Sequence, residues 1–205
     1  MKKLTPLFLA ALFVIAGTTA KSQNLQGQTV FNFNLGYSLT GDLIKGLFDE
    51  GTNSTIKVSP VIILGADYGL SEKFSIGASF TTQGMKGTIT DNWWYDDNDS
   101  LITENFDFKI RRSHIAIIPK YHYTSDNDKL DIYSGLRLGF VMWSYKDDSN
   151  DPTFTAFDDL KGRVTVGFTT GMRYYFTDNI GANVDLNLGA PYVVSFGLNY
   201  KLGGN

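Results

Sequence analysis

Apolar and polar residues alternate along most of the chain after residue 22, in eight segments of about ten residues. In the last segment, apolar and aromatic residues form one row, and mainly small or polar residues form the other. These rows are Tyr192, Val194, Phe196, Leu198, Tyr200 and Leu202 against Val193, Ser195, Gly197, Asn199 and Lys201. A period of two residues is typical of a β-strand whose two faces meet different surroundings. We therefore predict eight strands, within residues 31–39, 60–68, 74–81, 114–123, 132–140, 164–176, 180–188 and 192–202.

The connections between these predicted strands are alternately short and long, and no convincing helical periodicity occurs in them. The short ones, rich in Gly, Ser, Asp or Asn, span residues 69–73, 124–129 and 177–179. The long ones span residues 40–55, 84–105 and 142–162, and the last connection, residues 189–191, is short but lies on their side. Outer-membrane barrels have an even number of strands, with short periplasmic turns and long external loops. The pattern thus predicts that both chain termini are periplasmic.

The contents of the two rows distinguish a barrel in lipid from a barrel in water. The main alternative, a soluble eight-stranded barrel of the lipocalin type, packs large apolar residues inside. Here the second row is small and polar, and it carries six charged residues: Asp67, Lys120, Arg137, Arg173, Asp185 and Lys201. Aromatic residues gather near the short turns, as in a membrane-interface girdle: Tyr68, Phe74, Tyr121, Tyr123, Tyr174, Phe176 and Tyr200. The sequence therefore predicts an all-β, eight-stranded antiparallel up-and-down transmembrane β-barrel.

The N-terminus has the three parts of a secretory signal peptide. Lys2 and Lys3 are followed by an apolar stretch over residues 4–17, which is too short to span a bilayer as a helix. Ala20 and Ser22 then occupy the −3 and −1 positions of a cleavage site before Gln23. We predict that residues 1–22 are removed and that residues 23–205 form the barrel domain; an uncleaved anchor helix is the alternative.

Composition narrows the functional classes. The chain has no Cys, which excludes a disulfide framework and a lipidated cysteine. Its formal net charge is −3, whereas a nucleic-acid-binding protein needs a basic face. The acidic segments 91–99 and 147–159 offer oxygen ligands for Ca²⁺, but neither matches an EF-hand loop. We therefore expect no metal site, no cofactor and no nucleic-acid partner.

With its signal peptide, eight alternating segments and short turns, the chain resembles the small outer-membrane barrels of the OmpA/OmpX and PorT-like type. That family's C-terminal assembly signal is matched by Ser195, Gly197, Tyr200 and Leu202, although here a tail, residues 203–205, follows it. The resemblance implies location in the outer membrane, contact with its lipid, and recognition of these four residues by the barrel-assembly machinery.

Residues that could carry chemistry are few. His114 and His122 are the two histidines of the chain, and Ser113 points to the opposite face of a strand from His114. We expect no aligned Ser-His-acid set, and so no enzyme. The six charged residues of the second row are predicted to form a structural ion network in the lumen. Trp93, Trp94 and Tyr95 are predicted to form an interaction patch in a long loop.

Three functional hypotheses follow from these patterns. The first is a structural or surface-interaction role through the long extracellular loops, with a surface or periplasmic protein as a candidate partner. The alternative is a narrow pore for small solutes or ions, although eight strands leave little internal space. The third is a lipid-modifying enzyme, which the absence of an aligned catalytic set disfavours.

Overall fold

The computed structural model describes residues 26–49, 54–96, 98–152 and 160–203. Along these residues the elements are β1 (Thr29–Tyr37), α2 (Leu39–Asp49), β2 (Ser54–Val58), β3 (Val61–Gly69), β4 (Phe74–Tyr95), β5 (Leu101–Tyr123), β6 (Leu130–Asp147), β7 (Arg163–Tyr175), β8 (Ile180–Leu188) and β9 (Val194–Leu202). In this part of the chain, no helix is long and apolar enough to cross a membrane. The predicted signal peptide lies outside the described residues.

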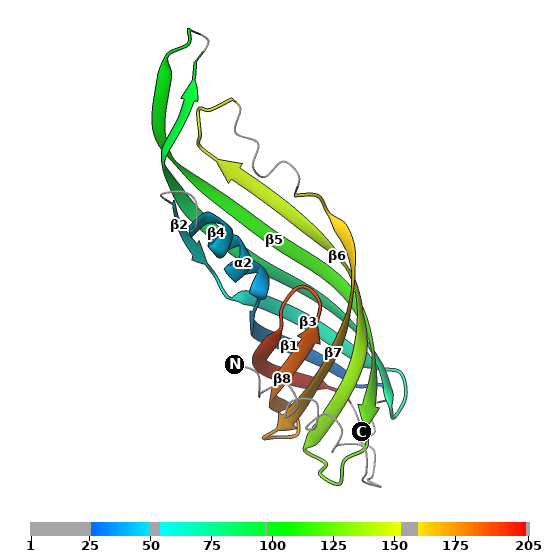
Figure 1. Ribbon diagram of the computed structural model, residues 1–205. Coiled ribbons are helices and arrows are strands. Elements are labelled where there is room, and N and C mark those ends of the chain that lie inside the picture. The colour runs from blue at the N-terminus through cyan, green and yellow to red at the C-terminus, as the bar shows by residue number, and fades with distance from the viewer. Residues whose placement is uncertain (1–25, 50–53, 97, 153–159, 204–205) are drawn as a thin grey trace, which may run out of the picture.

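The strands form one closed antiparallel sheet (Figure 1) in the order β2-β4-β3-β1-β9-β8-β7-β6-β5, which the pairing of β4 with β5 closes. β2 and β3 both pair with β4, one after the other along its length. Ser59 and Pro60 interrupt them, so that β2 and β3 together occupy one position in the barrel wall. The predicted eight-stranded antiparallel barrel is confirmed.

The short turns and the first and last strands meet at one end of the barrel. Thr29, the first residue of β1, is opposite Leu202, the last residue of β9. Tight backbone hydrogen bonds close two of the turns at this end: the N–H of Leu70 donates to the carbonyl of Phe74 at 2.8 Å, and that of Phe176 donates to Ile180 at 2.9 Å. The predicted short connections are therefore in place, and they share an end with both terminal strands.

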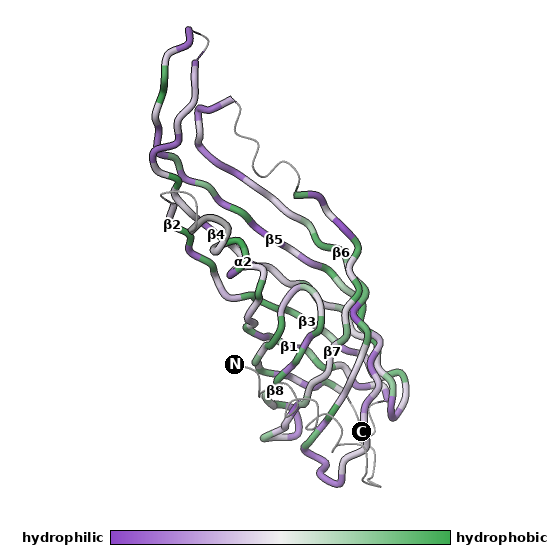
Figure 2. Tube along the Cα trace, in the orientation of Figure 1, coloured by the Kyte–Doolittle hydropathy of each residue, from purple (hydrophilic) through white to green (hydrophobic). Residues whose placement is uncertain are grey.

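The barrel wall is apolar outside and polar inside. Outward side chains such as Leu64 (50% exposed), Ile117 (56%) and Leu198 (59%) belong to a continuous apolar surface around the wall. Inward residues include many buried polar groups, among them Asn34 and Arg173. The alternation is visible along the strands in Figure 2. A soluble monomer rarely exposes so large an apolar surface, whereas lipid solvates it.

Three strands continue far beyond the apolar wall, which corrects the prediction of a loop over residues 84–105. β4 and β5 stay paired as far as Tyr95 and Leu101, and only the turn 96–100 separates them. In Figure 1 this hairpin, with β6 beside it, rises well above the shorter strands. Alternation continues here, with Phe106 and Phe108 inward and Asp107 and Lys109 outward. This extension of β4 and β5 was not predicted, because strands were sought only at the length that crosses a membrane. β6 likewise extends to Asp147, into the predicted loop 142–162.

The connection after β1 contains a helix that the sequence pattern did not reveal. Leu39, predicted as the end of a strand, is the first residue of α2. The Ser38 hydroxyl accepts the N–H of Thr40 at 3.3 Å, which is an N-cap contact, and Asp42 lies in the first turn, where the helix dipole favours an acid. Gly41 and Gly46 weaken the helical signal, so tertiary packing against β2 stabilises this helix.

Tyr192 is also placed differently from the prediction. The alternation assigned it to the outward row of the last strand, but β9 begins only at Val194 and Tyr192 is 3% exposed. The alternation changes in the turn between β8 and β9, where Val193 is exposed and Tyr192 is buried. Tyr192 consequently points inward and packs with Val61 and Ile63.

Candidate functional site

Asp67 is at the centre of a buried ion network in the lower lumen, the half nearer the short turns. Its carboxylate accepts hydrogen bonds from Lys120 Nζ at 2.8 and 2.9 Å and from Asn32 Nδ2 at 2.9 Å. The Arg173 guanidinium binds the same carboxylate and reaches Asp131 through Nη1 at 3.3 Å. Asp67 and Arg173 are 4% and 1% exposed. Two cations and two carboxylates from four strands are thus held together away from solvent.

Asp185 extends this network across the lumen. Its carboxylate accepts hydrogen bonds from Asn34 and Asn183, both at 3.0 Å, and from the Tyr133 hydroxyl. The Tyr133 ring also lies under the Arg173 guanidinium, 4.5 Å from its centre, which adds a cation–π contact. The barrel interior at this level is therefore filled by polar groups that bind one another, although Arg173 Nε and the Oδ1 atoms of Asn34 and Asn183 have no hydrogen-bond partner.

The structure places the six predicted lumen charges on the inner face, but it separates two of them from the central network. Arg137 donates to Ser79 at 2.9 Å and to the Tyr192 hydroxyl at 3.1 Å. Lys201 lies 4.7 Å from the centre of the Tyr175 ring. Asp131, Tyr133 and His122 belong to the network and were missed. Their place in the inward row of the alternation could have identified them.

The lower lumen leaves almost no free space. A cavity of about 30 Å³ lies among the Asp67, Lys120, Tyr133, Arg137 and Arg173 side chains. This volume corresponds to about one or two water positions. The described interior therefore offers no continuous aqueous path at this level.

Ser75, His122 and Asp131 form an aligned Ser-His-Asp set, contrary to the prediction that none exists. Ser75 Oγ lies 2.8 Å from His122 Nε2, and His122 Nδ1 lies 2.7 Å from Asp131 Oδ1. The alignment arises because three neighbouring strands place these residues on the inner face, a juxtaposition that sequence spacing does not reveal. All three residues are buried, and the adjoining cavity is about 10 Å³. No acyl substrate fits there, so we interpret the set as structural.

A reactivity test separates this interpretation from that of a hydrolase. We expect a fluorophosphonate probe to leave the folded barrel unlabelled, because Ser75 Oγ is enclosed by neighbouring side chains. Mass spectrometry of the treated protein measures the adduct, and Ser75→Ala is the control. Labelling of the folded protein that disappears in Ser75→Ala would show an active nucleophile.

Arg112 marks the upper limit of the polar lumen. Its guanidinium donates to Thr40 at 2.6 Å, to Ser38 and Gln83 at 2.8 Å, and to the carbonyl of Pro191 at 2.5 Å. It therefore ties the start of α2 to β4 and to the turn before β9. Above it the interior is apolar: a cluster formed by Ile56, Met85, Ile89, Phe106, Phe108 and Ile110 packs against Ile44 of α2. The inner face of β2, β4 and β5 above Arg112 is thus covered by α2 and by its own apolar side chains.

The predicted patch Trp93, Trp94 and Tyr95 is divided by the extended hairpin. Trp93 (66% exposed) and Tyr95 (60%) share the outward face, and their rings lie 6.4 Å apart in an edge-to-face arrangement. Leu101, opposite Tyr95, is 59% exposed. Trp94 points to the other face and is half-buried. The exposed large apolar side chains near the tip are therefore those of Trp93, Tyr95 and Leu101.

Two carboxylates give the extension a defined shape. Glu104 accepts N–H bonds from Asn150 at 3.1 Å and Asp151 at 3.2 Å, which attaches the segment after β6 to the hairpin. Although burial raises the pKa of Glu104, hydrogen bonds from Ser149, Asn150 and Asp151 lower it below its ordinary value. In the tip turn, the backbone N–H groups of Ser100 and Asn98 lower the pKa of Asp96. Among the described residues, the acids and histidines form no group of three suited to a metal ion.

No protein-family model matches the chain, and neither does any curated protein. Solved structures do match it. The outer membrane protein OprG from Pseudomonas aeruginosa aligns with a TM-score of 0.57 at 11% identity, covering 92% of this chain and all of OprG. The N-terminal β-barrel domain of Pseudomonas aeruginosa OprF (TM-score 0.47, 11% identity, 88% and 100% coverage) and Neisserial surface protein A (0.44, 14%, 86% and 98%) also align. Together with its apolar outer wall, the likeness to OprG identifies the chain as an integral membrane protein with the fold of the small outer-membrane β-barrels.

Proposed function

We propose that this outer-membrane barrel serves as a rigid support that presents the tip of its β4–β5 hairpin to a partner outside the cell. In this proposal the short turns and both termini are periplasmic, and the described interior conducts nothing. The C-terminal residues Ser195, Gly197, Tyr200 and Leu202 serve assembly, and no catalytic turnover takes place.

The exposed tip of the hairpin is the observation that carries this proposal. From Ser113, near the top of the apolar wall, β5 continues for twelve residues to Leu101, roughly 40 Å along the strand. At its end, Trp93, Tyr95 and Leu101 present apolar side chains to solvent. Exposed aromatic residues in a compact patch are typical anchors of protein interfaces. A barrel without a partner has no need of such a surface so far from lipid.

The filled lumen disfavours the alternative of a narrow pore. The Asp67 network fills the lower half of the lumen, and Arg112, bonded to Thr40, Gln83 and Pro191, crosses the interior above it. Conduction would need both to move aside at once. The contacts of the described residues therefore support an interaction role more than transport.

Site-specific photocrosslinking in intact cells tests the proposal. A photoreactive phenylalanine analogue at Trp93 is expected to give a discrete adduct, and the same analogue at Phe176, exposed at the short-turn end, is expected to give none of that mass. Replacing Tyr95 and Leu101 with alanine should abolish the Trp93 adduct while the barrel still folds. No adduct at Trp93, or an identical adduct at Phe176, would contradict the proposal.

Orientation is checked in the same cells, because the chain has no Cys of its own. A membrane-impermeant maleimide is expected to label Thr103→Cys on the hairpin and to leave Asp126→Cys at a short turn unlabelled. The reverse pattern would place the hairpin in the periplasm.

A further inference from the structure

Four lysines form a row across the outer face of four neighbouring strands. The strand register places Lys57 of β2 opposite Lys86 of β4, Lys86 opposite Lys109 of β5, and Lys109 opposite Lys146 of β6. All four are exposed, and each lies on the outward side of its strand. We call these residues the lysine row. Arg111 points outward one position nearer the membrane on β5.

Such a row is electrostatically unfavourable unless an anion lies against it. Like charges directly opposite each other destabilise a sheet, and the row contains three such pairs. In the part of the chain that the structure describes, no ion pair joins a lysine of the row to a carboxylate. The nearest outward acids, Asp107 and Asp148, lie one position further from the membrane. Asp107 accepts the Thr88 hydroxyl at 2.6 Å, and Asp148 accepts the Asp107 N–H at 2.6 Å.

The row lies just above the apolar wall. The outward residues change in the same way on each long strand, from Phe80 through Thr82 and Gly84 to Lys86 on β4, and from Ile115 through Ser113 and Arg111 to Lys109 on β5. Lys109 lies four positions from Ser113 along β5, which is roughly 10 Å along the barrel axis for a strand tilted by about 40°. Lysine side chains can bend back towards the interface, so their ammonium groups reach the level of lipid headgroups.

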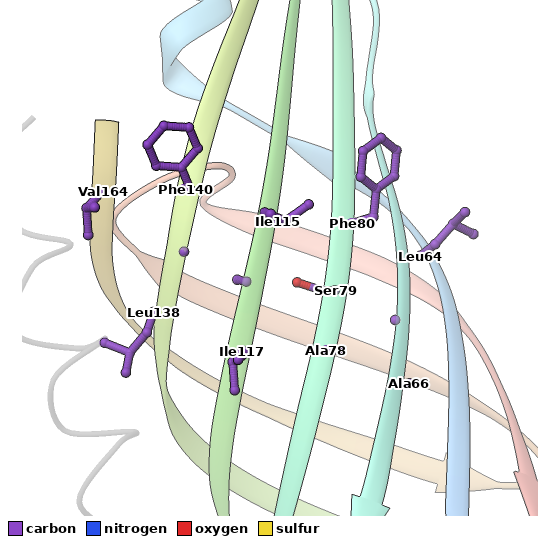
Figure 3. A pocket seen from close by; sticks show the side chains of 13 residues that line it. Leu64, Ala66, Ala78, Ser79, Phe80, Ile115, Ile117, Leu138, Phe140 and Val164 are labelled. Atoms are coloured by element: carbon purple, nitrogen blue, oxygen red, sulfur yellow. The ribbon is translucent and has the colours of Figure 1, made fainter. Parts of the chain in front are cut away.

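An apolar hollow lies below the lysine row, on the outer face of β3, β4, β5, β6 and β7. Its volume is about 790 Å³, and its walls are formed by Leu64, Phe80, Ile115, Ile117, Leu138 and Phe140. Figure 3 shows these side chains around a floor of small residues that includes Ala66 and Ala78. Another outer hollow, of about 480 Å³, lies on β1, β3, β8 and β9. Only the first lies beneath the row.

We propose that the lysine row and this hollow together bind a phosphorylated glycolipid of the outer leaflet, of the lipid A type. Its phosphate groups lie against the row and one of its acyl chains fills the hollow. The two surfaces lie in the same order as the parts of such a lipid that they bind. The lysines are above, at the level of its phosphate groups, and the apolar hollow is below, at the level of its acyl chains. The bound lipid relieves the repulsion between the lysines, and this role goes beyond the proposed contact at the hairpin tip.

Native mass spectrometry of the refolded barrel in neutral detergent tests the charged surface, with diphosphoryl lipid A as the probe. Lys86→Gln/Lys109→Gln is expected to weaken retention about 25-fold, at about fivefold per lysine. Lys73→Gln/Lys129→Gln, which removes two exposed lysines at the short-turn end, should leave retention unchanged. Lys86→Arg/Lys109→Arg keeps both positive charges and should retain lipid A as well as the wild-type protein does. Raised salt should weaken the binding of lipid A to the wild-type protein.

A matched pair of variants tests the hollow. Ala78→Phe fills it without changing charge and is expected to weaken retention about tenfold, equivalent to the loss of about two buried methylene groups. Ala182→Phe, on the outer face of β8, should have no effect.

Equal retention by the Lys86/Lys109 and Lys73/Lys129 glutamine variants would overturn the proposal, as would equal retention of dephosphorylated lipid A or phosphatidylglycerol. Displacement of the lipid by millimolar inorganic phosphate would indicate a free-anion site instead, which also overturns it. Gel mobility before and after boiling confirms that each variant is folded.

Discussion

Replacement of Asp67 with asparagine is expected to lower the free energy of unfolding of the barrel by about 3–5 kcal/mol. The carboxylate neutralises Lys120 and Arg173 at distances of hydrogen-bond length, and all three side chains are buried. Asparagine keeps the size of the side chain but leaves two buried cations with less compensation. Denaturant unfolding in lipid vesicles, followed by the difference in gel mobility between folded and unfolded forms, measures the loss.

Two further variants show whether this loss comes from the network. Asp178→Asn removes a carboxylate from an exposed turn and should change stability by less than about 0.5 kcal/mol. Adding Lys120→Met to Asp67→Asn removes one uncompensated cation and should restore part of the stability, because residues of one network are not additive. If Asp67→Asn and Asp178→Asn have equal effects, the lumen charges do not depend on each other.

Leu136→Arg is expected to destabilise the barrel by about 2–4 kcal/mol in a bilayer. Leu136 is 51% exposed and lies near the middle of the outward apolar row of β6, where a charged group would meet hydrocarbon. In water an exposed leucine on a strand would tolerate arginine with a change of about 0.5 kcal/mol or less. The same unfolding measurement thus separates a wall in lipid from a wall in water.

The matched control is Thr103→Arg, an exposed outward position on the hairpin beyond the apolar wall. It should be nearly neutral, because the side chain remains in water. Equal effects of the two arginines would place the lipid boundary elsewhere and would contradict the membrane level used for the lysine row.

The interior and the exterior of the barrel have different roles in this arrangement. Inside, the network around Asp67 and the hydrogen bonds of Arg112 hold the strands in one arrangement and leave little space. Outside, the lysine row and the hairpin tip are the surfaces left without partners of their own among the described residues. The two proposed binding surfaces, the lysine row and the hairpin tip, thus lie at two heights above the apolar wall.

The sequence by itself determined the fold class. A period of two with one apolar row is a local property of each segment, and it can be recognised without knowing which strands are its neighbours. It predicted eight wall strands, three short turns and the inward direction of Asp67, Lys120 and Arg173. It did not predict α2, since Gly41 and Gly46 make that helix depend on packing. The reach of β4 and β5 was missed because strands were sought only at the length of a membrane.

Only the tertiary structure decided which residues meet. Ser75, His122 and Asp131 lie on three strands, and their alignment depends on register between segments up to 56 positions apart in sequence. The lysine row has the same origin: Lys57, Lys86, Lys109 and Lys146 are unremarkable in sequence and become one surface through three registers. Alternation tells which face a side chain occupies, whereas register, which arises from closure of the whole barrel, tells what lies beside it.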